Sequence, residues 1–386
     1  MDFKLSKEHE MARKMFREFA ENELEPLAVE IDEEERFPWE SVEKFARYGM
    51  MGIPIPKKYG GAGGDNLMYC IAIEEIAKKC GTSSVIVAAH TSLCMGPIMA
   101  FGTEEQKMKW IPDLASGRKI GAFGLTEPGA GTDASGQQTT AVKDGDDWIL
   151  NGSKCFITNG DTASTYTVLA VTDRSKGYRG MTMFVVEKGM PGFSTGVHEK
   201  KMGIRGSSTT DLIFEDVRVP DANRLGKVGQ GWQVVMHTLN GARAGVAAQA
   251  LGIGEGALDL AMKYVQERMQ FKKKLSKFQR TQFEIADMHT KLEAGKLLVY
   301  SAACKEDAYN KGDKTQNYAM DSAMAKLFCG ETASDVTRRC VQLFGGYGYI
   351  REYQVERMMR DAKITEIYEG TSEAQRMVIS GQLGIK

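Results

Sequence analysis

The chain of 386 residues lacks the features that mark several large classes of protein. No uninterrupted apolar run approaches the roughly 20 residues that a membrane-spanning helix needs, so we expect no membrane insertion. The N-terminus, MDFKLSKEHE, has no apolar stretch after its basic residues, which argues against a signal or transit peptide. A cytoplasmic location is the resulting expectation.

Cysteine, histidine and net charge give no binding signature. The seven cysteines are odd in number, scattered and never spaced as C-x-x-C, which favours reduced, buried thiols over disulfides or a zinc site. The five histidines show no spacing such as H-E-x-x-H, so no metal is predicted. The 50 basic and 51 acidic side chains nearly cancel, and no nucleic-acid partner is expected.

Two common catalytic motifs are also absent. No G-x-S-x-G nucleophile elbow and no G-x-x-x-x-G-K-[ST] phosphate loop occurs. These absences weaken the case for a serine hydrolase or a nucleotide triphosphatase without closing it, because a triad can be assembled from distant residues. What the chain does have is 42% apolar residues, enough for two or three packed domains.

The hydrophobic pattern changes twice along the chain and predicts a multi-domain α+β protein. Residues 1–120 show apolar spacings of three to five, as amphipathic helices do. Residues 121–228 contain short β-prone runs joined by turn pairs, with no crossover helices, which favours an antiparallel sheet or barrel over a doubly wound sheet. Residues 229–386 return to long helices. The expected order is a helical domain, a β domain and a second helical domain.

Local signals predict where some helices end. Gly49 follows a helix expected to start at Trp39, and Thr103 with Gln106 three residues later forms a capping box. The glycines of GIGEG, residues 252–256, lie inside a helical pattern. Close helix packing is favoured there over phosphate binding.

Two Gly-rich segments and two arginines suit ligand binding. The loop GLTEPGAGTDASGQQT, residues 124–139, offers backbone N–H groups and hydroxyls to a cofactor or phosphate, but lacks the helix of a Rossmann motif. The break VQLFGGYGY, residues 341–349, lets the backbone approach a ligand or simply ends a helix. Arg243 and Arg268 suit phosphate or carboxylate oxygens, and each could equally form a surface ion pair.

Glu369 stands at a break in the helical pattern near the C-terminus. Tyr368 and Gly370 flank it, and Thr371 or Ser372 can cap a following helix. In an apolar cleft the pKa of this carboxyl would rise, and the group could remove a proton from carbon. A solvated carboxylate at an element end is the alternative, and for an isolated Glu it is the commoner case.

Several motifs taken together resemble those of the acyl-CoA dehydrogenase family: GLTEPGAGTD, NGSKCFITNG, ERMQF, VQLFGGYGY and MRDAKITEIYEGTSEAQR. The α–β–α order is similar to that family along essentially the whole chain, and the bacterial short-chain, butyryl-CoA branch is the most similar. The resemblance implies an N-terminal helical domain, a middle antiparallel β-barrel and a C-terminal four-helix bundle. It also implies a homotetramer that binds FAD noncovalently.

The resemblance makes Glu369 the catalytic base. It would remove the α-proton of a short-chain acyl-CoA thioester while hydride leaves the β-carbon for flavin N5, giving a trans-2-enoyl-CoA. The Glu369 backbone N–H and a flavin ribityl hydroxyl would hydrogen-bond the thioester carbonyl. Some relatives carry the base on an earlier helix, at the position of Ala242, which cannot act as one.

The resemblance also assigns binding residues. Those implied for FAD are Phe123, Leu125, Thr126, Thr132, Phe156, Ile157, Thr158, Arg268, Phe271, Gln279, Gln342, Gly345, Gly346, Thr371 and Glu373. Of these, Arg268, Gln279 and the segment from Gln342 to Gly346 would act across a subunit interface. Those implied for the substrate are Thr132, Asn240, Arg243 and Gly370. Two positions depart from the family pattern: Asn240 replaces a common Asp, and Lys272 replaces a Gly at the subunit or cofactor rim.

The implied electron partner is an electron-transferring flavoprotein, and the direction of reaction stays open. The same residues serve a reverse reaction, as an enoyl-CoA reductase or an arylacryloyl-CoA reductase with caffeyl-CoA-like substrates. The segment 93–101 departs from the usual butyryl pattern, which leaves room for a changed acyl pocket. An acyl-CoA oxidase is disfavoured because such chains are much longer, and a non-catalytic flavin-binding module is disfavoured because Glu369 is present.

Overall fold

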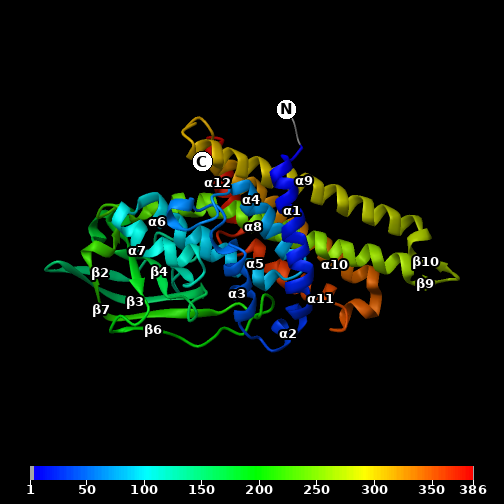
Figure 1. Cartoon of the computed structure of the whole chain (residues 1–386), viewed down its shortest axis with the longest axis horizontal. Helices are drawn as coiled ribbons and strands as arrows, with labels where there is room; N and C mark the ends of the chain where they lie inside the picture. The colour runs from blue at the N-terminus through cyan, green and yellow to red at the C-terminus, as the bar shows by residue number, and fades with distance from the viewer. Residues whose placement is uncertain (1–3, 386) are drawn as a thin grey trace.

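A computed structural model describes residues 4–385 of the chain (Figure 1). Its first part is helical: α1 (Lys7–Phe19), α2 (Ala28–Glu33), α3 (Trp39–Arg47), α4 (Asn66–Ala77), α5 (Gly81–Ala88), α6 (Gly96–Phe101) and α7 (Glu104–Ala115). Gly49 has a φ of +70° just after α3, and Thr103 and Gln106 make both bonds of a capping box on α7. Both predicted helix ends are confirmed.

The middle part is an eight-stranded sheet built from β1 (Gly121–Gly124), β2 (Thr140–Asp144), β3 (Asp147–Thr158), β4 (Thr165–Val171), β5 (Met181–Glu187), β6 (Phe193–Thr195), β7 (Thr209–Pro220) and β8 (Arg224–Leu225). The hydrogen-bonded path runs β6-β7-β3-β2-β4-β5-β8. The expected α–β–α order is confirmed, whereas the domain boundaries at 120 and 228 stay predictions.

Two strands pair in parallel with β4, where antiparallel pairing was expected. β1 lies along the first half of β4, with Gly121 opposite Thr165, and β2 reaches its end, with Thr140 opposite Val171. Both strands run in the same direction because the loop 125–139 leaves the sheet after β1 and returns to it as β2. This Gly-rich loop therefore lies beside β4, between the positions where β1 and β2 pair with it.

Both faces of the sheet are buried at β4. On β4, Tyr166 and Val168 belong to one hydrophobic cluster, which extends into α1, α4 and α8, while Leu169 and Val171 belong to a second cluster under α6 and α7. Alternate residues of a strand point to opposite faces, so a strand packed on both sides is apolar throughout. All seven residues of β4 are buried.

One helical run passes between these two clusters. It comprises α5, a π-helical turn η5 (Ala89–Met95) and α6. By length and composition the run Gly81–Phe101 could cross a membrane, with a mean hydropathy of 1.6, but 72% of its apolar window is buried within the protein. His90 in the π turn donates from Nε2 to the Leu114 carbonyl (3.1 Å) and accepts at Nδ1 from the Gly121 N–H (2.9 Å). The run is thus packed as a core helix.

The last part consists of long helices with a small hairpin: α8 (Gly231–Glu267), β9 (Met269–Gln270), β10 (Lys273–Lys274), α9 (Gln279–Asn310), α10 (Tyr318–Phe344), α11 (Val355–Lys363) and α12 (Ser372–Gln382). Helices α8, α9 and α10 pack on one another, α11 packs on α8 and α10, and α12 packs on α10. The helical bundle predicted after residue 229 is confirmed.

Glycines on α8 allow its close approach to α4. A Cβ at Gly252 would lie 2.2 Å from the Glu74 carbonyl oxygen, and one at Gly256 would lie 2.3 Å from that of Lys78. The packing role predicted for GIGEG is confirmed. Figure 1 shows the sheet at one end of the long axis and the β9–β10 hairpin at the other.

Candidate active site

Glu369 lies in the turn between a short 3-10 segment, η10 (Ile364–Glu366), and α12. The turn has two successive left-handed residues, Glu369 with a φ of +52° and Gly370 with a φ of +97°. Thr371 then caps α12 by accepting from the Ala374 N–H at 3.2 Å. The predicted helix break and the Thr371 cap are confirmed.

One carboxyl oxygen of Glu369 is buried and unsatisfied. This atom, Oε2, is inaccessible to solvent and has no hydrogen-bond partner. Burial raises the pKa of this group to about 8, although the nearby cations Lys326 and Arg243 oppose that rise. A buried polar atom without a partner is rare in folded proteins and marks a position where a ligand or a reaction needs it.

Arg243 reaches the same region from α8. It is only 5% exposed, donates from Nη1 to Asn240 Oδ1 at 2.6 Å, and leaves its buried Nε without a partner. Burial lowers the pKa of this guanidinium to about 10, while Glu369 favours its charged form. Arg243 is therefore not the surface ion pair weighed as an alternative. Ala242 beside it is buried and offers no base.

The predicted substrate residues fall into two groups. Gly370 adjoins Glu369, and Arg243 with Asn240 lies within electrostatic range of it. Thr132, in contrast, is exposed within the loop 125–139.

The predicted flavin-ring residues meet where this loop leaves the sheet. Thr126 follows β1, and its carbonyl accepts from the Cys155 N–H of β3 at 2.8 Å. Further along β3, Phe156 has a φ of +59° and is 63% exposed, whereas Ile157 is buried and Thr158 half-buried. The register shift between Lys154 and Ile157 turns the Phe156 ring outward. Phe123 and Leu125 line the core beneath them.

A buried ion pair supports this loop. Glu127 accepts from Lys154 Nζ at 2.6 Å, from the Thr139 N–H at 3.0 Å and from the Gln138 N–H at 2.6 Å. Lys154 is fully buried, and burial lowers the pKa of its ammonium to about 8. One carboxylate thus ties both ends of the loop to β3.

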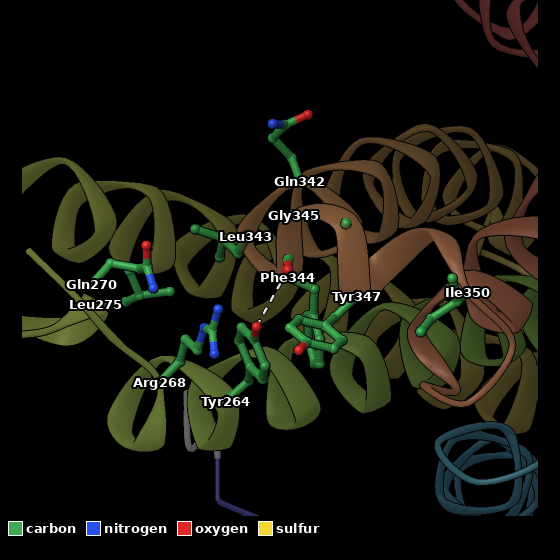
Figure 2. Close-up of a pocket in the computed structure, with 11 residues that line it drawn as sticks. Tyr264, Arg268, Gln270, Leu275, Gln342, Leu343, Phe344, Gly345, Tyr347 and Ile350 are labelled. Carbon is green, nitrogen blue, oxygen red and sulfur yellow. Dashed lines mark hydrogen bonds between the residues drawn. The ribbon is translucent and has the colours of Figure 1, made fainter.

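A second site lies at the far end of the bundle, where a cavity of about 420 Å³ opens between α8 and the end of α10. Figure 2 shows its aromatic wall and the guanidinium of Arg268 beside it. Tyr264 stacks on Phe344 with ring centroids 4.1 Å apart, and the Cζ of Arg268 lies 5.2 Å from the centre of the Tyr347 ring. Arg268 makes no ion pair within residues 4–385. Its charge is free to meet an anion.

Four of the predicted cofactor residues line this cavity: Arg268, Gln342, Gly345 and Gly346. A Cβ at either glycine would meet nothing within 4 Å, so the backbone is open to a ligand. Gln342 extends away from Arg268 (Figure 2).

Three other predicted cofactor residues are exposed and lie outside this cavity: Phe271, Gln279 and Glu373. Phe271 is 87% exposed at the tip of the β9–β10 hairpin. Lys272 beside it has a φ of +64°, the left-handed region that favours glycine. The roles of these three residues stay predictions.

Models of three domains match the chain in order: "Acyl-CoA dehydrogenase, N-terminal domain" over residues 6–118, the middle domain over 122–217 and the C-terminal domain over 229–384. The chain belongs to the acyl-CoA dehydrogenase family. A short-chain specific acyl-CoA dehydrogenase from Clostridium acetobutylicum is 57% identical, with 99% of this chain and all of that protein aligned.

Other relatives in the acyl-CoA dehydrogenase family have reductase names. An acryloyl-CoA reductase (NADH) of Anaerotignum propionicum is 50% identical, covering 99% of this chain and 96% of that protein. The CarC subunit of a caffeyl-CoA reductase–Etf complex of Acetobacterium woodii is 48% identical, covering 98% of each.

Solved structures agree in fold. Butyryl-CoA dehydrogenase of Megasphaera elsdenii is 48% identical with a TM-score of 0.96, covering 99% of this chain and 100% of that chain. A chain from work on the electron transferring flavoprotein of Acidaminococcus fermentans is 51% identical, with a TM-score of 0.96 and 99% of each chain covered. A glutaryl-CoA dehydrogenase of Mycobacterium smegmatis in complex with FADH2 is 34% identical, with a TM-score of 0.92 and coverages of 99% and 96%.

Sequence reasoning about this acyl-CoA dehydrogenase missed two buried lysines. Lys154 lies on the core-facing side of β3, and Lys326 lies on the stripe of α10 that also buries Ser322 and Cys329. A lysine at a core position of a strand or helix was the available signal, because lysine is almost never fully buried unless it has a partner.

Proposed function

We propose that this chain is an FAD-dependent dehydrogenase of short-chain, butyryl-CoA-like thioesters that forms the trans-2-enoyl-CoA. The buried, unpaired carboxyl of Glu369 is the observation that carries this proposal. The short-chain name of the relative that is 57% identical supports the substrate class.

The residues present fit FAD at both ends of the molecule. Arg268, with no ion pair within residues 4–385, and the open backbone at Gly345 and Gly346 suit the pyrophosphate. Thr126 and the segment 156–158 suit the ring, in the company of Phe123 and Leu125. When bound there, FAD supplies the acceptor for the hydride from the β-carbon.

The chain itself supplies the base and a hydrogen-bond donor. Glu369 in its ionised form takes the α-proton onto its carboxylate. The Glu369 backbone N–H donates to no other group within residues 4–385, so it is free to bind the thioester carbonyl as negative charge develops on that oxygen. Arg243 and Asn240 on α8 contribute polar groups beside the carboxylate for the CoA part of the substrate.

The pKa of Glu369 gives the reaction a defined pH dependence. With a pKa of about 8, roughly a tenth of the carboxyl is ionised at pH 7. Dehydrogenation needs the ionised base, so its rate rises with pH and levels off above about pH 8. Enoyl reduction needs the protonated acid, so its rate falls across the same range.

Reduction of an enoyl-CoA or arylacryloyl-CoA is the second candidate. It is favoured by two relatives with reductase names, at 50% and 48% identity. An electron-transferring flavoprotein is the proposed redox partner in either direction, as the names of two similar chains suggest. The cytoplasmic location stays a prediction.

We propose a homotetramer from the family resemblance, and the position of the FAD residues on two separate parts of the chain supports an assembly of more than one copy. The ring residues lie on β1, on β3 and in the loop after β1, whereas the Arg268 cavity lies between the ends of α8 and α10, next to the β9–β10 hairpin. Two exposed apolar side chains, Tyr347 and Ile350, line that cavity. A second copy that covers this end would complete a site from two chains.

Anaerobic titration of the purified yellow protein with thioesters tests the function. We expect butyryl-CoA to bleach the flavin faster than longer acyl or arylpropionyl thioesters, with a rate that rises toward pH 8. Fastest bleaching by an arylpropionyl-CoA would establish the aromatic alternative. If no thioester perturbs the spectrum, the catalytic proposal is wrong.

A further inference from the structure

The turn that carries Glu369 is an unfavourable backbone conformation. Glu369 and Gly370 both have positive φ, and a left-handed conformation is strained for a residue that has a side chain. Glycine adopts it freely, whereas glutamate does not. The surrounding structure must therefore hold Glu369 in place.

Two buried side chains hold the carbonyls of this turn. Lys326 of α10 donates from Nζ to the Gly370 carbonyl at 2.6 Å. Gln375 of α12 donates from Nε2 to the same oxygen at 2.8 Å and to the Glu369 carbonyl at 3.4 Å. Lys326 is 1% exposed and Gln375 is fully buried, so water does not compete for these bonds. On the other flank, the Tyr368 hydroxyl donates to Gln249 Oε1 of α8.

Lys326 has no carboxylate in direct contact. Within residues 4–385 it makes no ion pair, and burial lowers the pKa of its ammonium to about 8. The carboxylate that most favours its charged form is Glu369, followed at longer range by Glu366 and Glu373, while Arg243 opposes it. A buried ammonium bonded only to a carbonyl is expensive to keep.

The charged groups around Glu369 come from several elements. Lys326 on α10 is the cation that lowers the pKa of Glu369 most, followed by Arg243 on α8. Tyr69 of α4 and Tyr368 of the same turn are the phenols that feel its charge, and burial holds both neutral by raising their pKa. Among residues 4–385, Lys326 is the one cation that combines a bond to the turn with a charge beside the carboxyl.

We propose that Lys326 is a positioning residue for Glu369, which fixes the left-handed turn through the Gly370 carbonyl and favours the ionised carboxylate through its charge. The inference rests on the proposed function of Glu369 as the base. The hydrogen bond of Lys326 and its positive charge have different roles in this proposal, so variants can test each one separately.

Three variants of the flavin-loaded enzyme separate hydrogen bond from charge. Lys326→Met removes both, Lys326→Gln keeps a donor without charge, and Lys78→Met is a control in a buried ion cluster away from this turn, bonded to Glu255 at 2.7 Å. The pH dependence of flavin bleaching by butyryl-CoA is measured for each. The infrared carboxyl band of Glu369, taken as the wild-type spectrum minus that of Glu369→Gln, is titrated in parallel.

We expect both Lys326 variants to move the titration midpoint of Glu369 up by about one pH unit, a tenfold loss of ionised base at pH 7. Above the new midpoint Lys326→Gln should recover near wild-type rates, whereas Lys326→Met should stay several-fold slower because its turn is loosened. Lys78→Met should leave the midpoint unchanged. If Lys326→Met fails to fold, Lys326→Gln still carries the test of charge.

An unchanged midpoint in Lys326→Gln, by rate and by infrared band, would overturn the proposal. A midpoint that moves equally in Lys78→Met would also overturn it, since the effect would then reflect general loosening. If Glu369→Gln bleached at the wild-type rate, the proposed function would fail instead, while the infrared titration would still report whether Lys326 controls the Glu369 carboxyl.

Discussion

The turn at Glu369 and the cavity at Arg268 are opposite kinds of site. Around Glu369, buried side chains from α8, α10 and α12 converge on one turn, and the charges beside the carboxyl all come from a single chain. Around Arg268, an aromatic wall and a guanidinium that makes no ion pair within residues 4–385 line an open cavity. The first site is enclosed by groups of one chain, whereas the second is an open cavity on the surface of that chain.

We therefore expect substitutions at the two sites to change different measurements, the reaction rate at one site and the amount of bound flavin at the other. Changes at the Glu369 turn should alter the rate per bound flavin. Changes at the Arg268 cavity should alter how much flavin is bound and leave the rate per flavin nearly untouched.

The largest expected effect is at Glu369. Glu369→Gln keeps the size of the side chain and removes the base, so bleaching by butyryl-CoA should slow by about 10²–10⁴-fold with flavin content unchanged. Stopped-flow absorbance measures the rate. Glu293→Gln, at a half-exposed carboxylate on α9, is the matched control and should keep the wild-type rate. A fast Glu369→Gln variant would assign the base elsewhere.

The sheet-side support of the same site is the next test. Lys154→Met leaves Glu127 buried without its cation and should lower the free energy of unfolding by about 3–5 kcal/mol, measured by urea unfolding. The double variant Lys154→Met/Glu127→Gln should recover part of that loss. Lys176→Met, which breaks an exposed pair with Asp173 in the same domain, should change stability by less than about 1 kcal/mol. Equal losses in the two lysine variants would contradict the support assigned to the buried pair.

Arg268→Ala tests the other end of the molecule. Loss of bonds from one guanidinium to a phosphate should weaken FAD retention by about 1.5–3 kcal/mol, or 10–150-fold, read from flavin absorbance after dialysis. The bleaching rate per remaining flavin should stay within about twofold of wild type. Arg280→Ala, at an 88% exposed side chain, is the control. A loss of rate without a loss of flavin would erase the distinction between the two sites.

The smallest expected effect is at the hairpin beside that cavity. Lys272→Gly places glycine at a φ of +64° and should stabilise the protein by about 0.5–1 kcal/mol, seen as a higher Tm. Lys273→Gly, one residue along in β10, should destabilise it instead, because a strand position gains nothing from glycine. If both substitutions shifted Tm in the same direction, the strain assigned to Lys272 would be wrong.

Periodicity and end signals in the sequence predicted most of the fold. The capping box at Thr103, the glycine stop at Gly49 and the break before Thr371 depend on neighbours three to five residues apart, which a sequence displays directly. The pairing of β1 and β2 along β4 depends on a loop of fifteen residues returning to one strand, and no local pattern encodes that return.

The residues of the candidate sites likewise include some that the sequence could predict and some that it could not. Glu369 could be found from its place at a helix break, and Arg268 from its motif. The partners of Glu369 could not, because Lys326 and Gln375 come from separate helices and meet only through the packing of α10 with α12. The gathering of Arg268, Gly345 and Gly346 around one cavity likewise depends on how α8 and α10 end together.

The π-helical turn η5 determines which hydrophobic cluster each half of the helical run Gly81–Phe101 packs into. Ile86 and Val87 before the turn join the cluster of the N-terminal helices, whereas Cys94 and Ile98 within and after it join the cluster under α6 and α7. Each residue advances an α-helix by about 100°, so one residue more or less in this turn would rotate everything downstream by that angle. A single deletion between positions 89 and 95 would therefore put Ile98 out of phase with its core while leaving the composition of the helix almost unchanged.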